Sequence, residues 1–273
     1  MRLGVMTDFG CGSAQDWAKE QTALGCTAVS FPINCEEAEK NPEMLRQYRE
    51  EAEKNNLLIA EVGVWRNTLA ADEKERNAAM DYAIRQLALA EEIGANCCVN
   101  VAGTPHGPRW DGGYAANFSR ETRKEIIGMV RKIIDEVRPK KTKFTLEPMP
   151  WMIPSGPQDY RILIDEVERD GFGVHLDFIN MVTGPDRYFC MNEFMDEVFE
   201  TLGDRICSVH LKDIRLLEDY TFMLKECACG EGVMDIKRYL ECVNGINPEL
   251  PVIIEHLASD EQYRNSFRYV SAL

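Results

Sequence analysis

Eight short apolar runs alternate with amphipathic helical stretches along the chain, and this alternation limits the fold more than any other feature. The runs cover residues 2–6, 27–31, 58–64, 97–103, 143–147, 173–177, 206–210 and 252–255. Strands that are each followed by a helix form a parallel sheet. Eight such units close a (β/α)8 TIM barrel, so the sequence predicts an α/β fold with one domain over residues 1–273.

An open, doubly wound sheet is the alternative architecture for the same alternation. That fold usually carries a glycine-rich phosphate-binding turn after its first strand. The segment after residue 6 contains Gly10 and Gly12 but lacks the third glycine of that fingerprint. The closed barrel is therefore favoured. Residues 72–94 and 119–137 have the clearest helical start and stop signals.

The net charge of −15 argues against nucleic acid and against an anionic membrane as partners. The N-terminus has no signal-peptide layout, and no apolar run approaches the length that spans a membrane. We therefore expect a cytoplasmic protein that binds a small molecule.

Metal-binding side chains end the last four predicted strands. They are Glu147, Asp177, His210 and Glu255. In a barrel these strand ends meet at the face where active sites lie. Three carboxylates beside one imidazole repel one another without a cation, and this oxygen-rich set suits Mn²⁺, Mg²⁺, Co²⁺ or Fe²⁺. The sequence thus predicts a divalent metal site, with Mn²⁺ as the expected ion, rather than separate helix caps and salt bridges. A lysine or arginine that bridges the acids would contradict it.

The motifs TLEPMPW, GVHLDFIN, SVHLKDIR and IIEHL resemble those of the xylose isomerase-like TIM barrels. This superfamily contains sugar isomerases, ketose 3-epimerases and inosose dehydratases. The resemblance extends over nearly the whole chain and implies four metal ligands, which are Glu147, Asp177, His210 and Glu255. The combined run EPMPW…VHLDFIN…HLKDI…EHL is most similar to the large subunits of C-glycoside deglycosidases, which act on 3-keto sugars.

The chemistry that this resemblance implies is removal of a proton next to a carbonyl group. A metal that holds the keto oxygen and a neighbouring hydroxyl stabilises the enediolate that forms. Return of the proton on the other face gives epimerisation, whereas a leaving group on the next carbon gives β-elimination. Ketose 3-epimerases carry histidine and arginine where this chain has Asn180 and Leu216. We therefore place a keto-sugar lyase first, acting on a 3-oxo-glycoside or C-glycoside, with a sugar isomerase or epimerase as the alternative.

Two glutamates and one histidine are the candidate catalytic residues. Glu147 and Glu255 are candidates for the base, and His106 is another if the protein is a lyase. The expected substrate-binding residues are His175, Asn180, Lys212, Trp65, Trp110 and Trp151. A surface position explains His106 equally well, and Lys212 is explained as a cap of the next element. His256 follows Glu255 by one residue, so it is expected to point away from the lumen.

Two other classes of protein fit these features less well. Endonuclease IV shares the barrel but has a three-metal site rich in histidine, whereas this chain has 4 histidines and a charge of −15. An inactive binding module would lack one of the four ligands, and none is missing. The sequence leaves open whether a smaller partner subunit or a second copy of the chain, in a homo-oligomer, completes the pocket.

Overall fold

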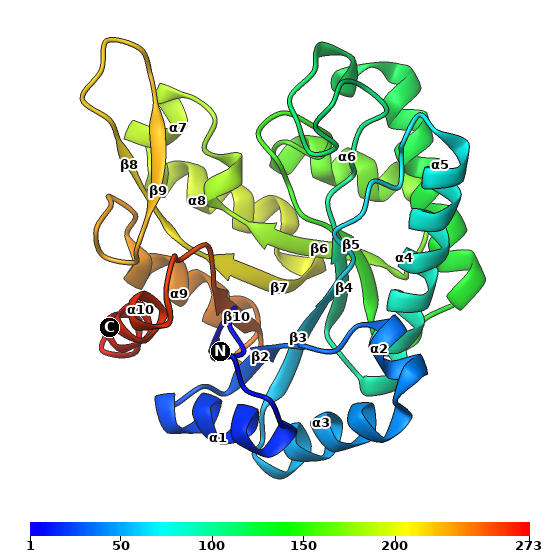
Figure 1. The fold of residues 1–273 in the computed structure, drawn as a ribbon. Helices are drawn as coiled ribbons and strands as arrows, with labels where there is room; N and C mark the ends of the chain where they lie inside the picture. Colours follow the sequence, from blue (N-terminus) through cyan, green and yellow to red (C-terminus); the bar gives the residue numbers. More distant parts are fainter.

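The computed structural model describes residues 1–273 and shows eight parallel strands that curl into a barrel inside a layer of helices (Figure 1). The barrel strands are β1 (Arg2–Val5), β2 (Ala28–Ser30), β3 (Leu58–Gly63), β4 (Cys97–Asn100), β5 (Lys143–Leu146), β6 (Phe172–Asp177), β7 (Ile206–Leu211) and β10 (Pro251–Ile254). Their order is β1-β10-β7-β6-β5-β4-β3-β2. Every predicted strand overlaps one of these, and the predicted TIM barrel is confirmed.

The barrel is nearly closed between its first two strands. The backbone N–H of Thr27 donates to the carbonyl oxygen of Leu3 at 2.8 Å, and the Leu3 N–H donates to Thr27 Oγ1 at 3.1 Å. A Cβ atom at Gly4 would lie 2.1 Å from the carbonyl oxygen of Ala28. Because only glycine lacks that atom, Gly4 allows β1 and β2 to approach each other so closely.

Ten helices and three 3-10 turns connect the strands. They are α1 (Ala14–Leu24), α2 (Cys35–Lys40), α3 (Pro42–Lys54), α4 (Glu73–Ile93), η1 (Ala115–Phe118), α5 (Arg120–Val137), α6 (Pro157–Val167), η2 (Ile179–Met181), α7 (Pro185–Phe189), α8 (Met191–Leu202), η3 (Gly203–Arg205), α9 (Ile236–Ile246) and α10 (Asp260–Ser271). The helices predicted over residues 72–94 and 119–137 are confirmed as α4 and α5.

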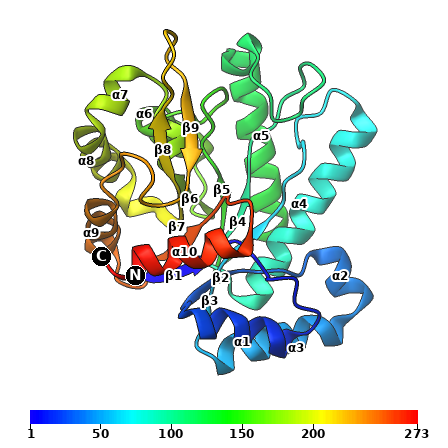
Figure 2. The same cartoon turned by 60° about the vertical axis from the view of Figure 1, so that its left-hand side comes forward.

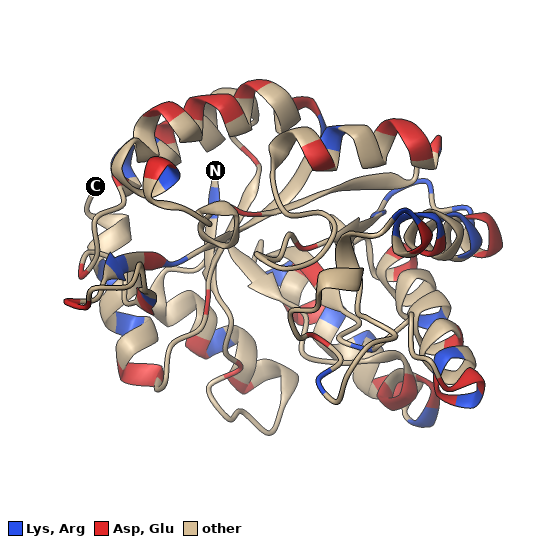
Figure 3. Cartoon of the chain, turned by 90° about the horizontal axis from the view of Figure 1, so that it is seen from above, with Lys and Arg blue, Asp and Glu red and all other residues tan.

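The surface of the molecule is formed largely by these outer helices. Acidic and basic residues lie along the same helices when the barrel is viewed from above (Figure 3). None of the helices combines the length and the apolar character that crossing a membrane requires.

A hairpin of two antiparallel strands, β8 (Asp213–Leu216) and β9 (Leu224–Cys227), projects from the barrel after β7 (Figures 1 and 2). The sequence analysis did not predict it. Asp213 anchors its base, because the carboxylate accepts hydrogen bonds from four backbone N–H groups. The donors are Ile214, Gly230, Gly232 and Met234.

Tyr160 of α6 ties together the two strands that precede Glu147 and Asp177. Its buried hydroxyl lies 2.5 Å from the carbonyl oxygen of Leu146 in β5 and 3.1 Å from that of Gly173 in β6, and it accepts from the Leu146 N–H at 3.2 Å. We expect Tyr160→Phe to lower the free energy of unfolding by about 1–3 kcal/mol, because it leaves buried backbone groups unpaired. Urea unfolding measures the change, with exposed Tyr269→Phe as the control. Equal stability of the two variants would contradict the expectation.

Candidate metal centre and active site

The four residues at the strand ends meet in one buried cluster. One potential ligand atom from each residue lies within 4.8 Å of the others, and the members are Glu147, Asp177, His210 and Glu255. Asp177 of β6 and His210 of β7 are direct neighbours in the sheet. His210 Nδ1 lies 2.8 Å from Glu255 Oε2 and 3.7 Å from Glu147 Oε2. The structure thus brings together all four predicted ligands, and metal binding by them stays a prediction.

The donor atoms of this cluster fit a divalent metal ion. Asp177 Oδ2 and His210 Nδ1 are buried and make no well-directed hydrogen bond. Both atoms nevertheless have a close charged neighbour: Lys212 Nζ lies 2.7 Å from Asp177 Oδ2, and Glu255 Oε2 lies 2.8 Å from His210 Nδ1. Neighbouring ligands of an octahedral ion with bonds of about 2.1 Å lie roughly 3 Å apart. His210 Nδ1 lies at about that spacing from Glu255 Oε2, at 2.8 Å, and somewhat farther from Glu147 Oε2, at 3.7 Å.

Lys212 reaches into the same cluster. Its side chain is 1% exposed, and Nζ lies 2.7 Å from Asp177 Oδ2 and 2.9 Å from Glu255 Oε1. Lys212 therefore bridges two of the three acids, which is the observation that we named as evidence against the metal site, but it makes no ion pair with Glu147. One ammonium balances one of the three carboxylates, so a divalent cation would balance the other two. The lysine supplies part of the positive charge that the sequence analysis assigned to the metal alone.

The environment separates the pKa values of the two glutamates. Burial, together with the charge of Glu255, raises the pKa of Glu147 well above its ordinary value. Burial also acts on Glu255, but the charges of His210 and Lys212 outweigh it and hold the pKa of Glu255 well below its ordinary value. In the metal-free chain these shifts favour a proton on Glu147 and an ionised Glu255.

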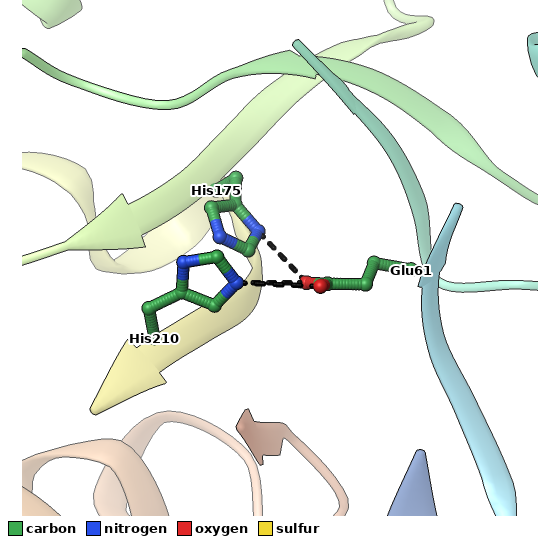
Figure 4. A group of neighbouring side chains, drawn as sticks. All are labelled: Glu61, His175 and His210. Atoms are coloured by element: carbon green, nitrogen blue, oxygen red, sulfur yellow. Dashed lines mark hydrogen bonds and ion pairs between the residues drawn. The ribbon is translucent and has the colours of Figure 1, made fainter. Parts of the chain in front are cut away.

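A second buried cluster lies on the other side of His210 (Figure 4). Glu61 of β3 is 1% exposed, and its Oε1 lies 3.3 Å from His210 Nε2. His175, which is fully buried, places Nδ1 3.6 Å from Glu61 Oε2. Burial lowers the pKa of His175 to about 3, so its ring is neutral. The sequence analysis missed Glu61, although a glutamate inside the apolar run 58–64 is a signal that could have revealed it.

A pocket of about 640 Å³ adjoins the first cluster. Glu147, Trp151 and Asn180 are among the residues that line it. Asn180 Nδ2 donates to Glu147 Oε1 at 2.9 Å, and Trp151 Nε1 donates to the carbonyl oxygen of Asp111 at 2.7 Å. The apolar part of the wall comprises Met149, Pro150, Ile179, Val182, Ile214, Phe222 and Leu224. The pocket therefore combines an apolar wall with polar residues, which include Arg109, Asp111, Thr183 and Glu226 besides Glu147 and Asn180.

Several predicted site residues do not line this pocket: His106, Trp65, Trp110, His175, Lys212 and three of the four predicted ligands, Asp177, His210 and Glu255. His106 lies in the loop between β4 and η1, where its backbone N–H donates to Thr104 Oγ1 at 3.1 Å. Trp65 follows β3 with a left-handed φ of 50°, and Trp110 packs against the hydrophobic core. Their roles in catalysis or substrate binding stay predictions.

His256 does not point away from the site, and this part of the sequence analysis is wrong. The residue lines the pocket, and its Nδ1 lies 2.9 Å from Glu226 Oε2. Its φ of 55° is left-handed, so the alternation of side chains along an extended strand does not continue through it. Glu226 was also missed, because it comes from the unpredicted strand β9. Its Oε1 lies 2.8 Å from Lys212 Nζ.

The sequence matches the family model of the xylose isomerase-like TIM barrels over residues 18–273. The chain belongs to this family. The family match and the barrel confirm the resemblance at the level of the superfamily. No curated protein matches the sequence.

Solved structures of similar fold include several with a stated enzymatic activity. A 3-keto-D-glucoside 4-epimerase from E. coli has 16% identity and a TM-score of 0.70, with 100% of both chains covered. The probable 3-DHS dehydratase AsbF from Bacillus anthracis has 16% identity and a TM-score of 0.75, with 99% of both chains covered. A family protein from Mycobacterium smegmatis in complex with magnesium has 16% identity and a TM-score of 0.68, with 98% of this chain and 92% of that chain covered. At these identities the similarity shows the fold alone.

Proposed function

We propose that this protein is a divalent-metal-dependent sugar isomerase or epimerase that acts on a keto sugar. The observation that carries the proposal is the meeting of three carboxylates and one imidazole beside a pocket of about 640 Å³. The similarity to the 3-keto-D-glucoside 4-epimerase supports a keto-sugar substrate. The structure with magnesium supports a divalent ion, and we propose Mn²⁺, with Mg²⁺, Co²⁺ or Fe²⁺ as substitutes.

This proposal reverses the order that the sequence analysis gave to the two reactions. For the lyase, His106 was a further candidate for the base, and it belongs neither to the pocket lining nor to the acid cluster. An epimerase needs two groups that exchange protons with the substrate. Glu147 and Glu255 both belong to the buried cluster and can fill these roles.

The proposed mechanism assigns a task to each part of the site. A bound divalent ion would stabilise the negative charge that develops on the substrate oxygen when the neighbouring carbon loses its proton. Glu147 and Glu255 carry protons to and from that carbon. Asn180 holds Glu147 through the 2.9 Å hydrogen bond to Oε1. Ile179 and Phe222 belong to the apolar wall, which offers the substrate a surface to pack against.

β-Elimination from a 3-oxo-glycoside, including a C-glycoside, is the second candidate function. The apolar wall favours it, because Phe222 and Leu224 of the β8–β9 region offer a surface against which an aromatic leaving group packs. The similarity to a probable dehydratase supports elimination chemistry. The resemblance of the motifs to those of the C-glycoside deglycosidases also supports this second candidate function.

Incubation of the full chain with Mn²⁺ and a 3-keto-glucoside or a free ketose in D₂O tests the proposal. We expect a new epimer or isomer that carries deuterium at the carbon next to the carbonyl, as read by NMR. EDTA should abolish the reaction, and added Mn²⁺ should restore it. Release of the leaving group without an epimer would instead favour the second candidate. Turnover that EDTA does not affect would contradict the metal dependence of both candidate functions.

A further inference from the structure

We propose that Glu61 is a positioning residue that orients His210 toward the metal. Glu61 accepts the Nε2–H of the imidazole, so that Nδ1 is free and faces Glu147 and Glu255. This inference rests on the proposed function, because it concerns the metal ion proposed there.

The two ring nitrogens of His210 face different residues. Both carboxylate oxygens of Glu61 lie 3.3 Å from Nε2 (Figure 4). Nδ1 is turned to the opposite side, 2.8 Å from Glu255 Oε2, and makes no well-directed hydrogen bond. Burial lowers the pKa of His210, but the charges of Glu255 and Glu61 outweigh it and raise this pKa well above its ordinary value in the metal-free chain. A bound metal would take the place of the hydrogen on Nδ1, and the neutral imidazole then carries its hydrogen on Nε2 only. With that hydrogen directed to Glu61, the lone pair of Nδ1 points at the acid cluster, as in carboxylate–histidine–metal arrangements.

Besides His210, one other nitrogen lies near Glu61: His175 Nδ1 is 3.6 Å from Oε2, which is too long for a hydrogen bond. Glu61 lies inside β3, opposite Ser30 of β2 and Cys97 of β4. It does not line the pocket, so it is not placed to touch a substrate. A buried carboxylate without a donor is costly, and Glu61 makes its only side-chain hydrogen bond with His210. Holding His210 is therefore the task that its contacts support.

His175 restricts the movement of both residues. Its ring packs edge-on against the ring of His210, with centroids 4.1 Å apart and planes at 82°. Nδ1 of His175 lies 3.6 Å from Glu61 Oε2 and 3.8 Å from Cys97 Sγ. Because His175 is fully buried, it fills the space into which Glu61 would otherwise rotate.

Titration of the metal-free full chain with Mn²⁺ in a calorimeter tests this role without any substrate. We expect Glu61→Ala to weaken Mn²⁺ binding about 100-fold and Glu61→Gln about 10-fold, since loss of a partner that orients a ligand lowers metal affinity by about 10- to 100-fold. Gln86→Leu is the matched control. Gln86 is also buried and bonds the same strand, through Gly63 O at 2.7 Å, but has no contact with His210. It should bind Mn²⁺ like the wild type.

The outcomes separate the two proposals. Wild-type affinity in folded Glu61→Ala would overturn the role of Glu61 and leave the proposed function intact. If Glu61→Ala does not fold, as judged by circular dichroism, the nearly isosteric Glu61→Gln decides in the same way. Equal weakening by Gln86→Leu would also overturn the role, because the effect would then be structural. Failure of the wild type to bind any divalent metal would overturn both proposals.

Discussion

Replacement of Glu147 by glutamine is expected to lower kcat by about 10³- to 10⁴-fold. Proton transfer by a positioned side chain contributes about 10²–10⁴ to the rate, and the variant also loses a charged ligand. Glutamine keeps the size of the side chain and can still accept the hydrogen bond from Asn180 Nδ2, which spans 2.9 Å in the wild type. The variant should therefore fold normally and lose its chemistry.

Saturation with Mn²⁺ distinguishes the loss of proton transfer from the loss of a metal ligand. If Glu147 were a ligand only, excess Mn²⁺ would restore kcat, whereas a proton carrier leaves kcat low at every Mn²⁺ concentration. Glu168→Gln is the control, because it makes the same chemical change at a carboxylate that is 73% exposed. Its kcat should equal that of the wild type. A Glu147→Gln enzyme that keeps a tenth or more of wild-type kcat would remove Glu147 from the mechanism.

The fold and the acid cluster were predictable because their signals are local in sequence. An apolar run followed by a helical pattern identifies a strand of a parallel barrel, and the last residue of such a run reaches the carboxyl face. Thus Glu147, Asp177, His210 and Glu255 could be placed together from their positions alone, and the structure does bring them together. Once eight strands are identified, the barrel fold determines which residues from distant parts of the sequence come together.

The parts of the site that escaped prediction depend on contacts between distant segments. Glu226 lies in a short strand of exposed and half-exposed residues, so no apolar pattern marks it. His256 enters the pocket through a left-handed backbone conformation, which a histidine seldom adopts and which strand alternation cannot reveal. The depth of Lys212 follows from its three acidic partners, which come from β6, β9 and the end of β10. From the sequence alone, a lysine of this kind would be predicted to lie on the surface.

Some residues were instead predicted to bind the substrate from their positions alone, and His175 is the clearest example. His175 shares a face of β6 with Asp177, and alternation correctly places it toward the lumen. It is nevertheless fully buried and faces Glu61 below the pocket. The lumen of a small barrel is packed with side chains, so only residues at the strand ends reach the open pocket. Asp177, two residues further along the strand, reaches the acid cluster, although it is fully buried as well.

Replacement of Lys212 by methionine is expected to destabilise the metal-free protein by about 3–5 kcal/mol, because removal of one partner of a buried ion pair leaves the other charge uncompensated. Methionine retains most of the side-chain volume, so the loss reflects charge rather than a cavity. Asp177 and Glu255 would then lack the ammonium that lies 2.7 and 2.9 Å from them. Urea unfolding in the presence of EDTA measures the effect.

Arg238→Met is the control for this variant. It removes a cation that lies 2.6 Å from Asp196 in a pair whose side chains are 40% and 45% exposed. Exposed pairs contribute about 0–1 kcal/mol, so the control should lose little stability. Mn²⁺ should stabilise Lys212→Met more than it stabilises the wild type, because the ion supplies positive charge beside the same two carboxylates. If Mn²⁺ stabilised both equally, lysine and metal would not share these acids, and the charge balance proposed for the site would be wrong.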